Sequence, residues 1–342
     1  MEPSNNPPND NQTNPREEEK PTLPKTTLLA PFQPVNAEDI CRAPIEYTQA
    51  LPGKATLTKF ITALESWFQT PEEYLTPMRE ITATLFTTIL VLDDIEDSTP
   101  LRRGHPAAHI KYGLGQTVNS ATYTLMTLTA SIAQRLGETA LQIFFQELKN
   151  LGAGQALDLH WTFEQKCPSL AEYLGMVDNK TGSLFRLVVR WMRIGTGGTG
   201  ADTGDEGNEE VLRLVALLGR YYQIRDDYLN LVDLEYTAKK GRCEDLDEGK
   251  FSFPLVCTLS RSARATEVHR LVFPGPVGEV RRGLADEEKE AVVEAMRECG
   301  AFEYTLTTLE ELWEGVWGVL DEVEARRGAN APLRRLILSM KV

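Results

Sequence analysis

The stretch ILVLDDIEDSTPLRRG, residues Ile89–Gly104, decides the fold and the chemistry that we expect. Four aliphatic residues run without a helix breaker into the acids Asp93, Asp94 and Asp97. On a helix, Asp93 and Asp97 are four residues apart, so both carboxylates project from one face. The stretch therefore predicts a helix with paired carboxylates at the mouth of an apolar pocket. Taken alone, the cluster is also compatible with a solvated acidic helix end.

A second acidic cluster lies in the stretch YYQIRDDYLN, residues 221–230. Asp226 and Asn230 repeat the four-residue spacing, and Asp227 follows Asp226 directly. Mg²⁺ takes oxygen ligands and usually bridges a few carboxylates to substrate phosphates. Two such clusters that face each other across a helical cavity would hold Mg²⁺ ions and one diphosphate group, so Mg²⁺ is the expected cofactor.

Helical periodicity extends over most of the chain outside these clusters. Apolar residues recur every three or four positions over 304–327 and over 211–232, which is the pattern of one helix face. Residues 81–92 are rich in Thr and Ile and could form a strand if taken alone. We expect a helix there because no breaker separates them from the first acidic cluster. The pattern predicts an all-α fold.

The termini and the charge exclude several classes of protein. Residues 1–32 are rich in Pro, Asn and Glu and lack the apolar core of a secretory signal, so we expect a disordered tail followed by one domain over 33–342. The uncharged stretch 112–134 contains Asn, Gln and several Thr, which predicts a buried helix rather than a membrane anchor. Five widely spaced cysteines without a CxxC pair indicate reduced thiols and a cytoplasmic location.

The net charge of −14, from 36 basic and 50 acidic residues, argues against a nucleic-acid partner, because phosphate backbones select a basic surface. It does not exclude a small diphosphate, which can bind through metal ions. The glycine-rich run 195–207 contains Gly-x-Gly spacing, but no strand pattern precedes it and no Walker lysine follows. We therefore expect neither nucleic acid nor a dinucleotide as a ligand.

Four stretches, in this order along the chain, resemble the motifs of trans-isoprenyl diphosphate synthases, especially fungal geranylgeranyl diphosphate synthases. They read DDIEDSTPLRRGHPAAH from Asp93, NKTGSLFRL from Asn179, YYQIRDDYLNL from Tyr221 and CEDLDEGKFSFPLV from Cys243. The resemblance runs from about Pro31 to the C-terminus. It implies an isoprenoid synthase helical bundle around a central hydrophobic cavity, usually a homodimer.

The resemblance also implies roles for individual residues. Asp93, Asp97 and Asp226 correspond to magnesium ligands, helped by Asp94, Asp227 and Asn230. The groups that hold the allylic diphosphate correspond to Arg102, Lys180, Thr181, Lys240 and Lys250, with Gln223 beside them. Thr88 and Ile89 would line the allyl chain, and Leu125 and Met126 the far wall of its pocket. The metals and cations would stabilise the leaving diphosphate, and a dry cavity would protect the allylic cation from water.

One part of the pattern departs from the family. In the family, a PGK-x-x-R segment and a histidine seven residues before the first aspartate hold the acceptor, isopentenyl diphosphate. Here Lys54 is present, but Leu57 and Phe86 replace the arginine and the histidine, which leaves Lys54 and Arg103 as the cationic contacts. A charge-assisted hydrogen bond contributes about 1.5–3 kcal/mol, so the loss of two predicts acceptor binding weaker by about a hundredfold or more.

This departure predicts a changed acceptor. Leu57 and Phe86 suit an aromatic nucleophile, and fungal indole-diterpene pathways use a similar protein that prenylates indole-3-glycerol phosphate. Lys54 and Arg103 would hold its single phosphate, and Phe86 would stack on the indole. The alternatives are an ordinary geranylgeranyl diphosphate synthase in which neighbouring residues compensate, and a class I terpene cyclase, which needs no acceptor. A regulatory subunit is disfavoured because both acidic motifs and their lysines are intact.

Overall fold

The computed structural model describes residues 36–53, 55–197, 206–233, 242–277 and 283–342. Every long element in this part of the chain is a helix, which confirms the expected all-α fold. The strands β1 (Leu101–Arg102) and β2 (His105–Pro106) form a short antiparallel hairpin that the sequence did not predict. The expected disordered tail, 1–32, lies outside the described residues. From Glu38 to Val342 the chain forms one compact unit.

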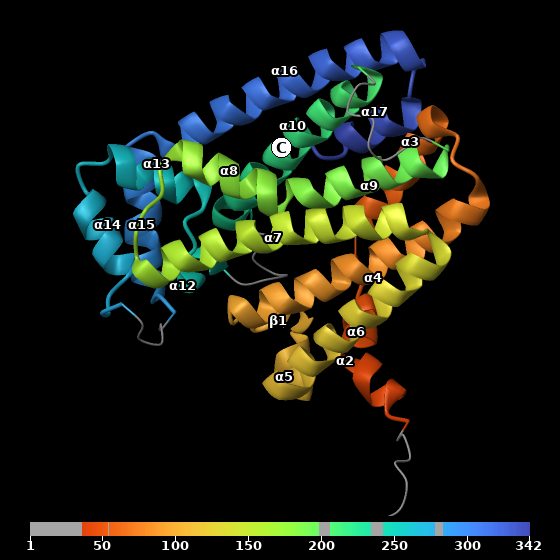
Figure 1. Cartoon of the computed structure of the whole chain (residues 1–342). Coiled ribbons are helices and arrows are strands. Elements are labelled where there is room, and N and C mark those ends of the chain that lie inside the picture. The colour runs from red at the N-terminus through yellow and green to blue at the C-terminus, as the bar shows by residue number, and fades with distance from the viewer. Residues whose placement is uncertain (1–35, 54, 198–205, 234–241, 278–282) are drawn as a thin grey trace, which may run out of the picture. The chain divides into compact units, whose positions relative to one another are not determined.

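The first half of this unit contains eight helices (Figure 1). They are α2 (Glu38–Ala50), α3 (Thr56–Phe68), α4 (Glu72–Glu96), α5 (Ala108–Tyr112), α6 (Leu114–Arg135), α7 (Glu138–Glu164), α8 (Leu170–Lys180) and α9 (Gly182–Gly195). The second half is formed by α10 (Glu206–Val232), α12 (Glu244–Glu248), α13 (Phe253–Arg261), α14 (Ala265–Val272), α15 (Asp286–Glu298), α16 (Ala301–Arg327) and α17 (Ala331–Leu338).

The local sequence explains where α4, which carries the first acidic cluster, and α8, which ends at Lys180, begin. Pro71 precedes α4, and the acids Glu72 and Glu73 occupy its first turn, where they interact favourably with the helix dipole. The ambiguous stretch 81–92 lies inside α4 and is helical. A capping box starts α8: the Ser169 hydroxyl accepts from the Glu172 amide, and the Glu172 carboxylate accepts from the Ser169 amide. This cap fixes the start of the helix that ends at Lys180.

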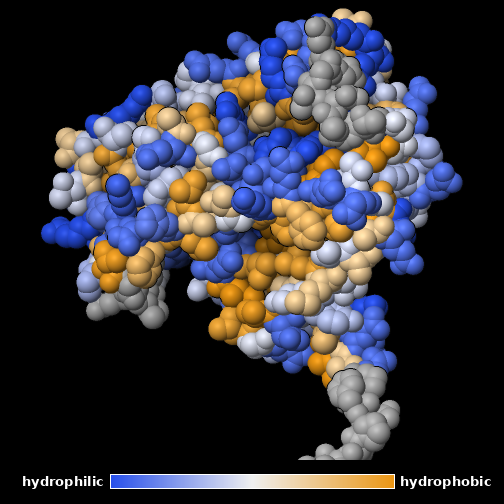
Figure 2. Space-filling view, in the orientation of Figure 1, coloured by the Kyte–Doolittle hydropathy of each residue, from blue (hydrophilic) through white to orange (hydrophobic). Residues whose placement is uncertain are grey.

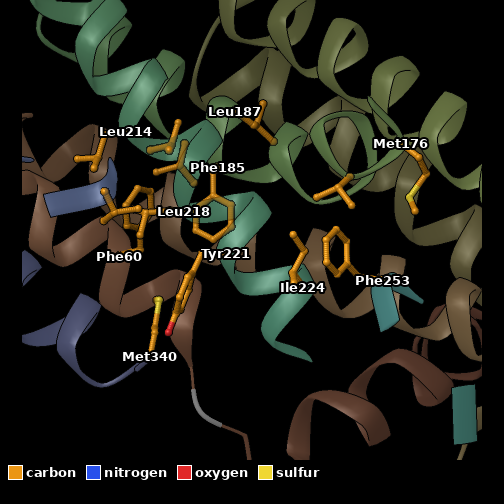
Figure 3. Packing of buried hydrophobic residues seen from close by; sticks show 14 of the residues in the cluster. Phe60, Met176, Phe185, Leu187, Leu214, Leu218, Tyr221, Ile224, Phe253 and Met340 are labelled. Carbon is orange, nitrogen blue, oxygen red and sulfur yellow. The ribbon is translucent and has the colours of Figure 1, made fainter. Parts of the chain in front are cut away.

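The hydrophobic core surrounds α10, which packs against α8, α9 and α16. Figure 3 shows Phe60 of α3 and Phe185 of α9 meeting beside α10, and their rings pack edge to face with centroids 5.2 Å apart. Tyr221 of α10 points toward Met340 near the C-terminus in the same view. The core therefore ties the second acidic helix to both ends of the compact unit.

Helix α6 differs from the expectation of a buried helix. One face is buried, but Val118 and Met126 are exposed, Met126 by 68%. Uncharged Thr, Ser and Ala residues on the buried face account for the apolar appearance of the sequence. By length and composition, α4 is the one helix of the described residues that could cross a membrane, and half of its most apolar stretch is buried inside the protein. A core helix has the same properties.

The C-terminal helix α17 is clamped to α3 by a buried asparagine. The Asn330 side chain is fully buried; its oxygen accepts from the Leu333 amide at 2.9 Å, and its nitrogen donates to the Ala63 carbonyl at 2.8 Å. The Trp67 indole also donates to the Gly328 carbonyl at 2.8 Å. The asparagine therefore caps α17 and holds it against the helix that begins beside Leu57.

Candidate active site

The first acidic cluster lies at the end of α4, where it meets the end of α8 and one face of α7. Asp93 Oδ1 lies 3.1 Å from Lys180 Nζ and accepts from Gln155 Nε2 at 3.2 Å. Lys180 Nζ also lies 2.9 Å from Asp158 Oδ2. The sequence did not predict a role for Gln155 and Asp158 of α7, because a Gln and an Asp three residues apart occur in many helices without a function. The structure brings Asp93 and Lys180 together as expected and adds these two residues.

Burial and charge separate the two carboxylates of this cluster. Burial raises the pKa of Asp93, but the charges of Lys180, Lys250 and Arg102 outweigh it and hold that pKa well below its usual range. Burial and the nearby charge of Asp93 raise the pKa of Asp97 to about 7. The ionised form of Asp97 is therefore disfavoured in this site, because the surrounding cations do not fully offset burial and the charge of Asp93.

Lys250 lies among several carboxylates of the site. Burial lowers the pKa of Lys250, but the charges of Asp245, Asp158 and Asp97 raise it well above its usual value, so this ammonium group stays charged. The Lys250 backbone amide donates to the Asp245 carbonyl at 2.9 Å, which fixes the turn after α12. Lys240, the other lysine expected here, lies outside the described residues.

Asp94 and Arg102 form a buried pair. Asp94 is 1% exposed, and its Oδ1 accepts from Arg102 Nε at 2.8 Å and from Arg102 Nη2. Arg102 lies on β1, so the hairpin that the sequence did not predict returns this guanidinium toward the end of α4. Asp94 thus holds Arg102, which in turn lies close enough to lower the pKa of Asp93.

The second cluster, on α10, is bound into the core. Asp227 accepts from the Tyr173 hydroxyl at 2.5 Å, from the Phe253 amide at 2.7 Å and from Gln223 Nε2 at 2.9 Å. Burial and the charge of Asp245 raise the pKa of Asp227 to about 7. Asn230 is 2% exposed, and its side-chain oxygen accepts from the Asp245 amide at 3.2 Å. Both residues bind protein groups, whereas Asp226 beside them is only half-buried.

The end of α8 connects the two clusters. Thr181 Oγ1 donates to Gln223 Oε1 at 2.8 Å, and the neighbouring Lys180 contacts Asp93. The structure therefore brings both expected acidic clusters to one site through two consecutive residues.

The chemistry of the donors fits a divalent cation. The partly exposed acids offer carboxylate oxygens, which Mg²⁺ prefers, and the raised pKa of Asp97 indicates negative charge that a cation would neutralise. Among the described residues, no three Asp, Glu, His or Cys side chains already surround one point as a formed metal site. Asp93, Asp97 and Asp226 are the residues that would hold Mg²⁺, with substrate phosphates as further ligands.

A narrow, partly open apolar pocket lies between α4, α7 and α9, and its lining begins one turn from the residues of this site. It is lined by Leu85, Ile89, Phe144, Glu147, Leu148, Leu151, Ser183, Leu184 and Leu187. Ile89 lines it as expected. Thr88 is not among the lining residues: it is fully buried, and its hydroxyl donates to the Thr84 carbonyl at 2.8 Å. Leu125 is half-buried, and the exposure of Met126 is inconsistent with the expected far wall.

The expected acceptor residues lie near the start of α3. Arg103 Nη1 donates to the Leu51 carbonyl at 2.9 Å, and its guanidinium lies against Gly53, where a Cβ atom would lie 2.8 Å from the guanidinium carbon. Leu57 and Phe86 are half-buried on α3 and α4, two helices that pack together. Lys54 lies outside the described residues.

Tyr222 of α10 adds a group to this region that sequence reasoning missed. Burial and the charge of Asp226 raise the pKa of Tyr222 to about 12, and hydrogen bonding with Thr56 opposes this rise. Tyr222 also interacts electrostatically with Arg103. The hydroxyl groups of Thr56 and Tyr222 therefore supply polarity beside Leu57, where the expected arginine is absent.

Comparison with known proteins agrees with this arrangement. Residues 38–277 match the model of the polyprenyl synthetase family. The chain is 42% identical over 303 residues to geranylgeranyl pyrophosphate synthase 3 of Zymoseptoria tritici, which covers 88% of this chain and 81% of that protein.

Larger fungal terpene synthases are also similar. Preaspterpenacid I synthase sttA of Aspergillus terreus is 42% identical over 311 residues, and bifunctional sesterterpene synthase astC of Talaromyces wortmannii is 40% identical over 318 residues. These matches cover 91% and 92% of this chain but only 39% and 41% of the relatives, so the chain spans about two fifths of their length. The chain belongs to the polyprenyl synthetase family, a family of prenyltransferases.

Proposed function

We propose that this protein is a Mg²⁺-dependent prenyl diphosphate synthase that joins an allylic diphosphate to isopentenyl diphosphate. The observation that carries the proposal is the end of α8, where Lys180 contacts Asp93 and Asp158 while Thr181 contacts Gln223. This arrangement links two acidic clusters through a buried lysine and its neighbour, next to an apolar pocket. The relatives named above, a geranylgeranyl pyrophosphate synthase among them, support the same reaction class.

The charged residues of the site would act on the leaving diphosphate. Lys180, Lys250 and Arg102 keep their positive charge and would bind its oxygens in a site largely shielded from water, where such contacts are strong. Bound Mg²⁺ would add further charge stabilisation to the departing group. The apolar cavity would take the hydrocarbon chain and keep water from the allylic cation.

The comparisons favour isopentenyl diphosphate over the indole acceptor that the sequence suggested, because the relatives named above are geranylgeranyl pyrophosphate and terpene synthases. Thr56 and Tyr222 support the same view, since their hydroxyls can bind phosphate oxygens beside Arg103. Leu57 and Phe86 still favour a second candidate, transfer of the prenyl group to indole-3-glycerol phosphate. Both candidates use the same donor site.

A product assay with three substrate sets separates these functions. The purified protein with Mg²⁺ receives a short allylic diphosphate with isopentenyl diphosphate, geranylgeranyl diphosphate with indole-3-glycerol phosphate, or geranylgeranyl diphosphate alone. We expect chain elongation in the first set. Product only in the second set would establish the indole acceptor, and a cyclic hydrocarbon in the third would indicate a terpene cyclase.

We also propose a homodimer. Figure 2 shows apolar residues gathered on the face where α4, α5 and α6 lie. The exposed large apolar residues of α5, α6 and α7 are Ile110, Leu114, Val118, Met126, Phe145, Leu157 and Phe163. Apolar patches of this kind usually mark an interaction site. Sedimentation should give twice the monomer mass, and Met126→Glu should shift the protein toward the monomer.

A further inference from the structure

The cavity continues from the charged site along three helices. On α4, Ile89 and Leu85 lie one and two turns before Asp93. On α7, the lining residues precede Gln155, and on α9 they follow Lys180. On each of these three helices, the lining residues thus begin beside a residue of the charged site. A hydrocarbon chain whose diphosphate is bound at the charged site would therefore point into the cavity.

One lining residue differs from the others, because Glu147 is a carboxylate in an apolar wall. It lies eight residues before Gln155, about 12 Å along the α7 axis. Its side chain is almost fully buried, and its two oxygens lie 3.0 Å from Arg186 Nη2 and 2.8 Å from Arg190 Nη1. We call these three residues the Glu147 ion cluster.

The Glu147 ion cluster is anchored to α8 and α9. Arg186 Nη1 donates to the Asp178 carbonyl at 2.7 Å, and Arg186 Nη2 donates to the lining residue Ser183 at 2.8 Å. Asp178 is itself paired with Arg220 of α10, with a shortest contact of 2.6 Å. Glu147, the one charged residue of the lining, is therefore held in place through α9 and, by way of Asp178, through α8 and α10.

We infer that the Glu147 ion cluster sets the maximum length of the isoprenoid chain, through charge rather than through side-chain size. This inference rests on the proposed prenyl diphosphate synthase function. A leucine or phenylalanine at the end of a pocket can change rotamer to admit another five-carbon unit. A hydrocarbon cannot replace the partners of the almost fully buried Glu147 carboxylate, so separating it from Arg186 and Arg190 would leave a buried charge unpaired.

The competing explanation is steric. Phe144 also lines the far end, and its ring stacks on Trp191 with centroids 6.4 Å apart, so its size could limit the chain. The two explanations differ in which substitution lengthens the product.

The test compares product lengths from a short allylic diphosphate with excess isopentenyl diphosphate, measured by mass spectrometry. In one variant, Glu147→Met, Arg186→Met and Arg190→Met replace the cluster with apolar side chains, a change that folded proteins often tolerate. We expect the main product to be at least one five-carbon unit longer than that of the wild type. The control, Glu80→Met with Arg135→Met, removes an exposed ion pair and should leave the length unchanged.

Two further variants keep the inference testable if the triple variant does not fold. Arg190→Met leaves Glu147 paired with Arg186 and should raise the fraction of longer product several-fold. Phe144→Leu should change the length little. Unchanged length in the folded cluster variants, or lengthening by Phe144→Leu alone, would overturn the inference. Absence of any elongation by the wild type would instead overturn the proposed function.

Discussion

The two acidic clusters have the same residue spacing but different surroundings. At the end of α4, Asp93 and Asp97 lie beside lysines, and their pKa values are driven apart. In α10, Asp227 and Asn230 bind a tyrosine hydroxyl and backbone amides. The comparison teaches that acidic or amide residues four positions apart share one face of a helix. The groups that surround them decide whether that face binds a ligand or anchors a wall of the site.

The largest expected effect comes from breaking the first cluster. Asp93→Asn should lower kcat by several orders of magnitude, because it removes a carboxylate that would hold Mg²⁺ beside the leaving group. Asp226→Asn should act similarly, and EDTA should abolish activity. Steady-state assays with circular dichroism as the folding control check this. Near-normal turnover in folded Asp93→Asn would contradict the assignment of the cluster.

The buried part of the second cluster, around Asp227, should respond in stability rather than in chemistry. Tyr173→Phe removes the hydroxyl that donates to Asp227 and leaves a buried carboxylate with one partner fewer. We expect the free energy of unfolding to fall by about 1–3 kcal/mol, measured by urea denaturation. At low temperature, kcat should stay within about tenfold of the wild type. A loss of activity as large as that of Asp93→Asn would remove the distinction between the clusters.

Substitutions on the acceptor side should leave both clusters unaffected. Leu57→Arg with Phe86→His restores two polar contacts of the family, and each charge-assisted contact contributes about 1.5–3 kcal/mol. We expect KM for isopentenyl diphosphate to fall by about tenfold or more. The decrease should be smaller than the sum of the two contact energies implies, because Leu57 packs on the core and its replacement disturbs that packing. The Mg²⁺ concentration for half-maximal activity should not change. A shift in that concentration would show that acceptor and metal sites are coupled.

The smallest expected effect is the pH dependence of stability, to which each of the two acidic clusters contributes one carboxyl group. The pKa values of Asp97 and Asp227 are both raised to about 7, so the folded protein binds more protons than the unfolded chain between about pH 4 and 7. The stability of the metal-free protein should therefore fall as the pH rises through this range. Melting temperatures at pH 5 and pH 8 measure the change.

Matched variants separate the two contributions to this pH dependence. Mg²⁺ should restore stability at pH 8 only for the part that is due to Asp97. Asp97→Asn should therefore weaken the stabilisation by Mg²⁺, whereas Asp227→Asn should preserve it. Equal responses of the two variants would mean that the metal does not distinguish the clusters.

Periodicity and motifs predicted the elements of the fold but not the contacts between them. Helices α10 and α16 follow from apolar residues every three or four positions, α4 follows from the absence of a breaker before the first acidic cluster, and both acidic clusters follow from their spacing. Gln155, Asp158 and Tyr222 could not be predicted, because their roles arise only when α7 or α10 packs beside another helix. The Glu147 ion cluster depends on the same kind of packing, since a single Glu in a helix usually indicates a solvated position.

The residues of α6 and the hairpin show the limits of composition. The stretch 112–134 was expected to be buried because it carries no charge, yet uncharged Thr and Met occupy the exposed face of α6 as well. The hairpin forms where Arg103 and Gly104 both have positive φ angles, of 55° and 79°. A non-glycine residue in that conformation is uncommon, so the sequence offered no signal for the turn.

The clamp formed by Asn330 links the C-terminal helix to the helix that begins beside the expected acceptor residues. Because this side chain caps α17 and also donates to Ala63, we expect a disturbance of α17 to shift α3, whose first turn contains Thr56 and Leu57. Acceptor preference can therefore diverge among related proteins through substitutions in a helix that touches no substrate. Two enzymes with identical active-site residues could select different acceptors for this reason.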